Sequence, residues 1–178
     1  MIAKTHSATV LGVDAHCIDV EVDLSIGLSQ FTIVGLPDGT IRESRDRILA
    51  ALSNSGLSLP IRKIVVNLAP APLRKIGSGF DLPIAIALLG AAGMLPAEML
   101  AEYMMVGELS LDGQIKPVTG VLPMTIEAKA KGLRGLVLAK ENEAEAAIVS
   151  EMRRVPVSRL EELVGYFQGS VEVEQGTF

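Results

Sequence analysis

The segment from Ile64 to Gly93 most constrains the fold of this 178-residue chain. Its first residues, 64–69, form a short, mostly apolar run that is rich in β-branched side chains, which is typical of a buried strand. Two prolines follow in a loop, and an apolar helix is expected over residues 85–93. Pro83 lies just before it, where a helix tolerates proline only in its first turn. The segment therefore predicts a strand, a long loop and a helix, as in α/β proteins.

The remaining sequence continues this alternation of strands and helices. We expect strands over residues 7–24 (a pair), 30–35, 135–139 and 155–157, and helices over 41–56, 124–131, 141–149 and 160–167. Thr40 is expected to cap the first helix, because Glu43 three residues later completes a capping-box pattern. Residues 104–111 and 114–118 flank Asp112-Gly113, which is typical of a type I′ hairpin turn. These elements predict one α/β domain with a mixed sheet, a β-hairpin and βα units.

Composition narrows the class of protein further. Only 3% of the residues are aromatic, so the core must consist of Ala, Val, Ile and Leu. The formal net charge of -5 disfavours non-specific binding to nucleic acid except through a local patch. The opening residues, 1–6, lack the charged stretch and apolar run of a signal peptide, and the longest apolar region, 82–95, is too short for a membrane span. We expect a cytoplasmic domain over residues 1–169, followed by a linker that starts at 170–178.

Two further patterns suggest a ligand site but are better explained structurally. Gly77-Ser78-Gly79 precedes a helix, yet the Gly-x-x-x-x-Gly-Lys-Ser/Thr pattern of a P-loop occurs nowhere in the sequence. Asp81 also places a negative charge where a phosphate would bind. Two histidines, one cysteine and one aspartate near the N-terminus lack the spacing of metal sites; they are His6, His16, Cys17 and Asp14. We therefore expect no cofactor and no metal ion in this chain.

The candidate DNA contacts are basic residues in two places. They are Arg42, Arg45 and Arg47 in the first helix, and Arg74 and Lys75 in the loop after the buried strand. Arg42 can pair with Asp46 and Arg47 with Glu43 at i,i+4 spacing, which is typical of a solvated helix face. Arg74 and Lys75 have no nearby acidic residue before Asp81, so we expect them to carry more of any contact with DNA.

Three stretches, residues 31–37, 67–85 and 106–123, resemble the ComM/YifB family of magnesium-chelatase-like AAA+ ATPases. The likeness extends from about residue 5 to residue 168. It implies a domain like the C-terminal domain of Lon proteases, a two-layer α/β fold of the ribosomal-protein type. It also implies that an ATPase module follows, which binds ATP and Mg²⁺, forms a homo-oligomeric ring and processes DNA by branch migration during natural transformation.

The resemblance also implies where a Lon-type Ser–Lys dyad would lie. The serine position falls at Gly79 and the lysine position at Leu122, and neither side chain can supply a nucleophile or a base. Ser78 is one residue away from the first position, and Lys129 lies two helical turns beyond the second. We expect a non-catalytic domain, in which the structural motif residues are Asp81, Pro83, Glu108, Asp112 and Gly113. The alternatives are a Ser–Lys peptidase and a subunit of magnesium chelatase.

Overall fold

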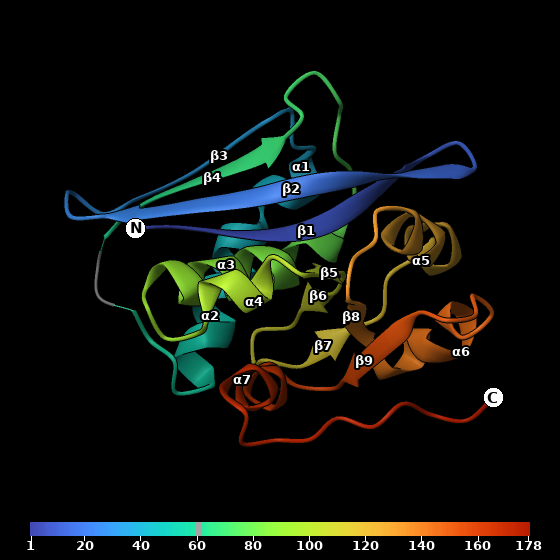
Figure 1. Cartoon of the computed structure of the whole chain (residues 1–178). Helices are drawn as coiled ribbons and strands as arrows, with labels where there is room; N and C mark the ends of the chain where they lie inside the picture. Colours follow the sequence, from blue (N-terminus) through green and yellow to red (C-terminus); the bar gives the residue numbers. More distant parts are fainter. Residues whose placement is uncertain (60–61) are drawn as a thin grey trace.

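A seven-stranded mixed sheet forms the centre of the computed structural model, which describes residues 1–59 and 62–178 (Figure 1). The strand order is β3-β4-β2-β1-β5-β8-β9. Four of the neighbouring pairs are parallel, whereas β2 runs antiparallel to both β1 and β4. The strands are β1 (Ile2–Leu11), β2 (Asp14–Ser25), β3 (Gln30–Val34), β4 (Lys63–Ala69), β5 (Tyr103–Met105), β8 (Gly135–Ala139) and β9 (Arg153–Val157).

Helices and one small hairpin occupy the connections between these strands. The helices are α1 (Gly39–Arg42), α2 (Ser44–Asn54), α3 (Asp81–Ala91), α4 (Ala97–Leu100), α5 (Val121–Ala130), α6 (Glu143–Ala146) and α7 (Leu160–Gln168), with 3-10 turns η1 (Ser78–Phe80) and η2 (Lys140–Asn142). The hairpin consists of β6 (Glu108–Leu109) and β7 (Ile115–Lys116). The predicted single α/β domain with a mixed sheet is confirmed. Within the described residues, no helix has both the length and the apolar character needed to cross a membrane.

The two faces of β1 pack against different helices because successive strand residues point to opposite sides of the sheet. The hydroxyl of Thr5 donates to the carbonyl of Pro83 in α3 at 2.9 Å. Ala8 and Val10 lie on the other face, in a cluster with Val121 of α5. The sheet is thus covered on one face by α3 and on part of the other by α5, which leaves the second face of β2 and β4 half-exposed.

The first helix begins earlier than predicted. Asp38 is its N-cap, since the Asp38 carboxylate accepts a hydrogen bond from the backbone N–H of Ile41 at 2.9 Å. Thr40 already lies inside α1, so the predicted capping role of Thr40 is wrong. The helix is also interrupted at Glu43, where α1 ends and α2 begins.

The predicted hairpin is shorter, and its turn has a different geometry. Residues 103–105 form β5 in the main sheet, and only β6 and β7 pair as a hairpin. The N–H of Gly113 donates to the carbonyl of Ser110 at 3.0 Å, and Gly113 has φ +92°. Asp112 is not among the residues with positive φ, whereas a type I′ turn requires positive φ at both central residues. The type I′ prediction is therefore wrong, and a three-residue loop ending at Gly113 closes the hairpin.

Candidate functional site

Asp81 is the centre of a buried polar network at the start of α3. Its carboxylate is inaccessible to solvent and accepts hydrogen bonds from Ser44 Oγ at 2.6 Å, Arg47 Nε at 2.6 Å and the backbone N–H of Leu109 at 3.0 Å. Burial raises the pKa of the Asp81 carboxyl, and the bonds from Arg47 and Ser44 oppose that rise. The same bond to Asp81 raises the pKa of Arg47. The network joins α2, α3 and β6.

The Asp81 carboxylate is bonded to α2 and β6, so it has a structural role at the start of α3. Pro83 is the third residue of α3, in the first helical turn as predicted. Asp112 accepts from the Ser110 hydroxyl at 2.8 Å and from the N–H of Gln114 at 3.1 Å, and the first of these bonds lowers the pKa of Asp112. Glu108 lies in β6, paired with Lys116 of β7. These motif residues thus have structural positions in α3 and in the β6–β7 hairpin.

The serine position of the Lon-type dyad, Gly79, lies in a groove between the 76–80 segment and the 117–119 segment, whereas Leu122 is not among the lining residues. The groove is lined by residues that include Asp38, Ser78, Gly79, Val118 and Thr119. A Cβ atom at Gly79 would lie 3.2 Å from the Cγ1 atom of Val118, so this position is closely packed. No lysine or histidine is among the lining residues in the described part of the chain. Ser78 therefore has no lysine or histidine base among the described residues that line this groove.

Lys75, which lies four residues before Gly79, and Lys129, which lies in the same helix as Leu122, have other partners. Lys129 donates to the carbonyl of Ser150 at 2.8 Å and lies 4.0 Å from the carboxylate of Glu151. Lys75 is 0% exposed, and its ammonium group donates to the carbonyl of Pro70. Burial lowers the pKa of Lys75. Neither lysine supplies a base to Ser78.

The burial of Lys75 corrects its predicted role as a DNA contact, because a side chain without solvent access cannot contact DNA. Its neighbour Arg74 is exposed. No sequence signal shows this difference, since residues of an irregular loop have no period from which side-chain direction can be predicted. Strand and helix positions have such a period.

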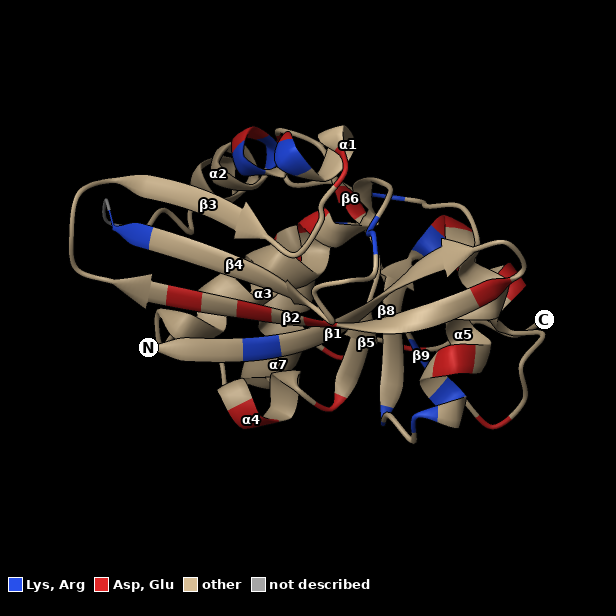
Figure 2. Ribbon diagram, turned by 90° about the horizontal axis from the view of Figure 1, so that it is seen from above, with Lys and Arg blue, Asp and Glu red and all other residues tan. Residues whose placement is uncertain are grey.

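Arg42 and Arg45 in α1 and α2 are exposed and line a hollow beside the edge strand β3. An adjoining hollow shares Arg45 and Phe31 and adds Arg62, which precedes β4 and was not among the candidates from the sequence. We call this surface the basic groove; it comprises Phe31, Thr32, Ile33, Arg42, Arg45 and Arg62. Figure 2 shows basic residues on α2 beside β3 and acidic residues along β2.

The ion pairs of these helices differ from those predicted. Arg47 contacts Glu43 at 3.5 Å, as expected, but its closer partner is Asp81. The expected pair of Arg42 with Asp46 is absent, and within residues 1–59 and 62–178 neither Arg42 nor Arg45 forms a salt bridge. The helix arginines are therefore more available to a ligand than the sequence indicated.

Comparisons with known proteins place the chain in a family. The family model described as subunit ChlI of Mg-chelatase matches residues 20–142. YifB of Escherichia coli K12 is 42% identical over 174 residues, covering 98% of this chain and 34% of that protein. Competence protein ComM of Haemophilus influenzae is 40% identical over 176 residues, covering 99% and 34%. A Lon protease of Chloroflexus aurantiacus is 28% identical over 165 residues, covering 85% and 20%.

The chain thus spans about a third of the length of the YifB and ComM relatives that it matches. The region matched by the family model includes the Asp81 network, both dyad positions and the basic groove. On the extent of these matches, the chain belongs to the magnesium-chelatase-like family that includes YifB and ComM.

Proposed function

We propose that this chain is a non-catalytic domain of a magnesium-chelatase-like AAA+ ATPase and that it contacts the DNA backbone through the basic groove. The observation that carries the proposal is the placement of Arg42 and Arg45, which are exposed and form no salt bridge among the described residues. Guanidinium groups bind phosphate oxygens in a bidentate manner, and phosphate contacts dominate the affinity of proteins for DNA.

The shape of the basic groove also suits an extended strand of nucleic acid. Arginines from α1, α2 and the segment before β4 line two hollows beside the edge strand β3, and Phe31 lines both hollows. Proteins that bind single strands combine a positively charged groove with aromatic side chains. With a net charge of -5, the rest of the surface opposes DNA binding, so contact is confined to this patch. Arg74 is a further exposed candidate, outside the residues that line this groove.

The proposed lack of catalysis is supported by the groove at Ser78. A serine nucleophile needs a neighbouring base, and Lys75 and Lys129 are both bonded elsewhere. A Ser–Lys peptidase is the second candidate function, because a Lon protease is among the relatives. The absence of a lysine from the residues described around Ser78 favours the non-catalytic function.

The full-length protein is proposed to act with ATP and Mg²⁺ bound to a module outside this sequence, since the P-loop pattern does not occur in these 178 residues. We further propose that it works in the cytoplasm as a homo-oligomeric ring. In that arrangement this domain would present the basic groove to DNA while the ATPase module supplies movement. One relative is named a competence protein, which fits DNA as the substrate.

The experiment that tests the DNA contact is a fluorescence-anisotropy titration with labelled single- and double-stranded DNA at low salt. The native chain is compared with an Arg42→Ala, Arg45→Ala double variant, which should bind at least about 10-fold more weakly if two phosphate contacts are lost. The matched control is Lys116→Ala, Lys140→Ala, since both lysines are exposed and form no salt bridge among the described residues. This control also removes two positive charges, but from residues that do not line the groove.

The outcomes separate a local site from a general effect of charge. Loss in the arginine variant with retention in the lysine variant supports the basic groove. Equal loss in both variants would mean that net charge alone sets the affinity, and equal binding by all three proteins would remove the groove as the contact site.

A further inference from the structure

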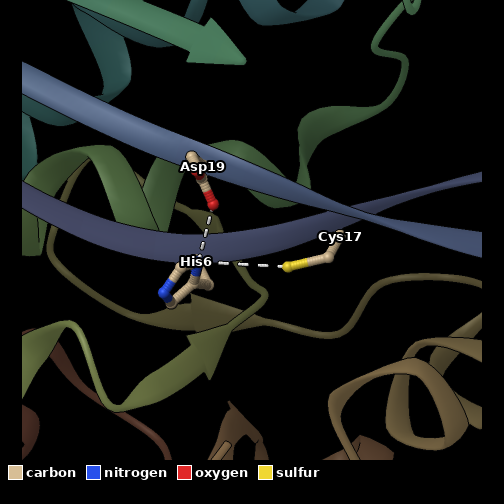
Figure 3. Close-up of side chains that lie close together, drawn as sticks. All are labelled: His6, Cys17 and Asp19. Carbon is tan, nitrogen blue, oxygen red and sulfur yellow. Dashed lines mark hydrogen bonds and ion pairs between the residues drawn. The ribbon is translucent and has the colours of Figure 1, made fainter. Parts of the chain in front are cut away.

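Three potential metal ligands lie close together on the paired strands β1 and β2, near the C-terminal end of α5. His6 lies directly opposite Asp19 in the antiparallel register, and Cys17 precedes Asp19 by two residues. Residues two apart on one strand share a face, and cross-strand partners have neighbouring side chains. Figure 3 shows Cys17 and Asp19 from β2 directed toward the imidazole of His6.

The ligand atoms are close enough to share one ion. His6 Nδ1 lies 2.9 Å from Asp19 Oδ1 and 3.9 Å from Cys17 Sγ. One nitrogen, one sulfur and one oxygen atom all lie within 4.8 Å of one another. Bond lengths to Zn²⁺ of about 2.0–2.3 Å place tetrahedral ligand atoms roughly 3.3–3.7 Å apart. Small side-chain rotations therefore bring the three atoms to coordinating distance.

The cluster opens to solvent, so an ion has a path to it. An open pocket is lined by His6, Cys17, Asp19, Ala69, Pro70, Lys131 and Leu133. This pocket lies where α5 ends, on the half-exposed face of the sheet. A three-ligand zinc site keeps one position for water or a ligand, and the open side of the pocket supplies that position.

Neighbouring groups contact two of the three ligand residues. Lys4 Nζ lies 3.3 Å from Oδ2 of Asp19, which leaves Oδ1 directed at His6. The carboxylate of Glu127, in α5, accepts a hydrogen bond from the backbone N–H of Cys17 at 3.0 Å. Such outer contacts fix the first ligands of metal sites. Lys131 is a further positive group that lines the pocket.

We propose that His6, Cys17 and Asp19 form a zinc site with an open fourth position. A thiolate, an imidazole and a carboxylate suit Zn²⁺, whereas Mg²⁺ and Ca²⁺ prefer oxygen ligands alone. The thiolate and the carboxylate together balance the charge of the ion. Binding displaces the proton of the Cys17 thiol to solvent and moves the imidazole proton of His6 to Nε2, so that Nδ1 coordinates.

The sequence analysis predicted no metal site here, because the spacing of residues along the chain does not reveal which residues lie opposite each other on paired strands. His16 and Asp14, which were considered with His6 and Cys17, are exposed and lie outside the cluster. Asp19 joins it only because the turn after β1 places Asp19 opposite His6.

The test uses the tag-free 178-residue chain, stripped of metal with a chelator, and titrates it with Zn²⁺ by calorimetry and with Co²⁺ by absorbance. We expect one ion per chain, a thiolate-to-cobalt charge-transfer band and the intense visible bands of tetrahedral cobalt. Cys17→Ser should abolish the charge-transfer band. Asp19→Asn should weaken zinc binding at least about 10-fold, because loss of a group that only supports a metal ligand already weakens binding by about that factor.

His16→Gln is the matched control, because it removes the other imidazole without touching the cluster. This variant should bind Zn²⁺ and Co²⁺ like the native chain. Circular dichroism establishes that each variant is folded. If Cys17→Ser does not fold, the zinc affinity of Asp19→Asn provides the test of the site. Absence of a charge-transfer band in the native chain, an unchanged band in Cys17→Ser, or loss of binding in His16→Gln would overturn the proposal.

Discussion

The Nε atom of Arg47 lies 2.6 Å from Oδ2 of Asp81, and this contact joins α2 to the first turn of α3. The Asp81 side chain is 0% exposed and that of Arg47 is 19% exposed, so the pair is largely shielded from water. Hydrogen bonds from Ser44 and from the backbone of Leu109 complete the shell around the carboxylate. The charged pair therefore fixes the helix that carries Arg45 against the helix that follows Ser78.

Arg47→Ala is expected to destabilise the domain by about 3–5 kcal/mol, the cost of leaving a buried charge without its partner. The free energy of unfolding in urea, measured at neutral pH, checks this. Arg45→Ala is the control on the same helix, since Arg45 is exposed and should change stability by no more than about 0.5 kcal/mol. Equal unfolding midpoints for the two variants would show that the Arg47–Asp81 pair contributes little.

Gly113→Ala is expected to destabilise the domain more than Gly12→Ala. Both glycines have positive φ, so both substitutions strain the backbone by about 1–3 kcal/mol. A Cβ atom at Gly113 would also lie 2.4 Å from Ser55 Oγ, whereas one at Gly12 meets nothing within 4 Å. The difference in Tm between the two variants, measured by thermal unfolding, reports the contact with Ser55. Equal decreases in Tm would mean that the hairpin moves away from Ser55 at no cost in stability.

Cys17 is expected to react slowly with iodoacetamide in the native protein. Burial, followed by the negative charges of Asp19 and Glu127, raises the pKa of the Cys17 thiol from 9.0 to about 11. The native state thus holds the thiol proton more tightly than the unfolded chain does. The stability that this provides is present below pH 9 and is lost as the pH rises through about 11.

The measurement is the alkylation rate at pH 8 with a chelator present, so that no metal ion protects the thiol. Native Cys17 should react about 100-fold more slowly than Cys17 in the urea-unfolded chain, since only the thiolate reacts. The rate in the native protein should rise about tenfold for each pH unit up to about 11. Equal rates in the native and unfolded chains at pH 8 would contradict the raised pKa.

Ser78 is expected to remain unlabelled by a serine-directed fluorophosphonate probe. Activation of a serine requires a base within hydrogen-bonding distance, and the two nearby lysines are bonded to the carbonyls of Pro70 and Ser150. Intact-mass analysis after incubation with the probe checks this, with a serine protease as the positive control. A stoichiometric adduct on Ser78 would support the peptidase alternative.

Much of the fold follows from local patterns in the sequence. The apolar run at 64–69 formed β4, and the alternation after residue 7 formed the β1–β2 pair, because burial on one or both faces dictates those patterns. The cap of the first helix was misplaced because Asp38 and Thr40 are both capable caps two residues apart. Which one acts depends on the backbone after β3.

The site was less predictable, since it depends on contacts between distant segments. The burial of Lys75 follows from the path of a loop, and the Arg47–Asp81 pair spans 34 residues. Pairing rules for an isolated helix assigned Arg42 to Asp46, yet the described structure leaves Arg42 in a groove with β3. Tertiary partners thus decide which arginines remain available, and the helix pattern alone does not contain that information.

The salt dependence of binding to single-stranded DNA tests the basic groove most directly. Each phosphate contact contributes a slope of about -0.7 to a plot of log K against log salt, so three arginines predict a slope of about -2. The Arg42→Ala, Arg45→Ala variant should reduce it to about -0.7, and the Lys116→Ala, Lys140→Ala control should leave it unchanged. An identical slope in the native chain and the arginine variant would contradict the proposed DNA contact.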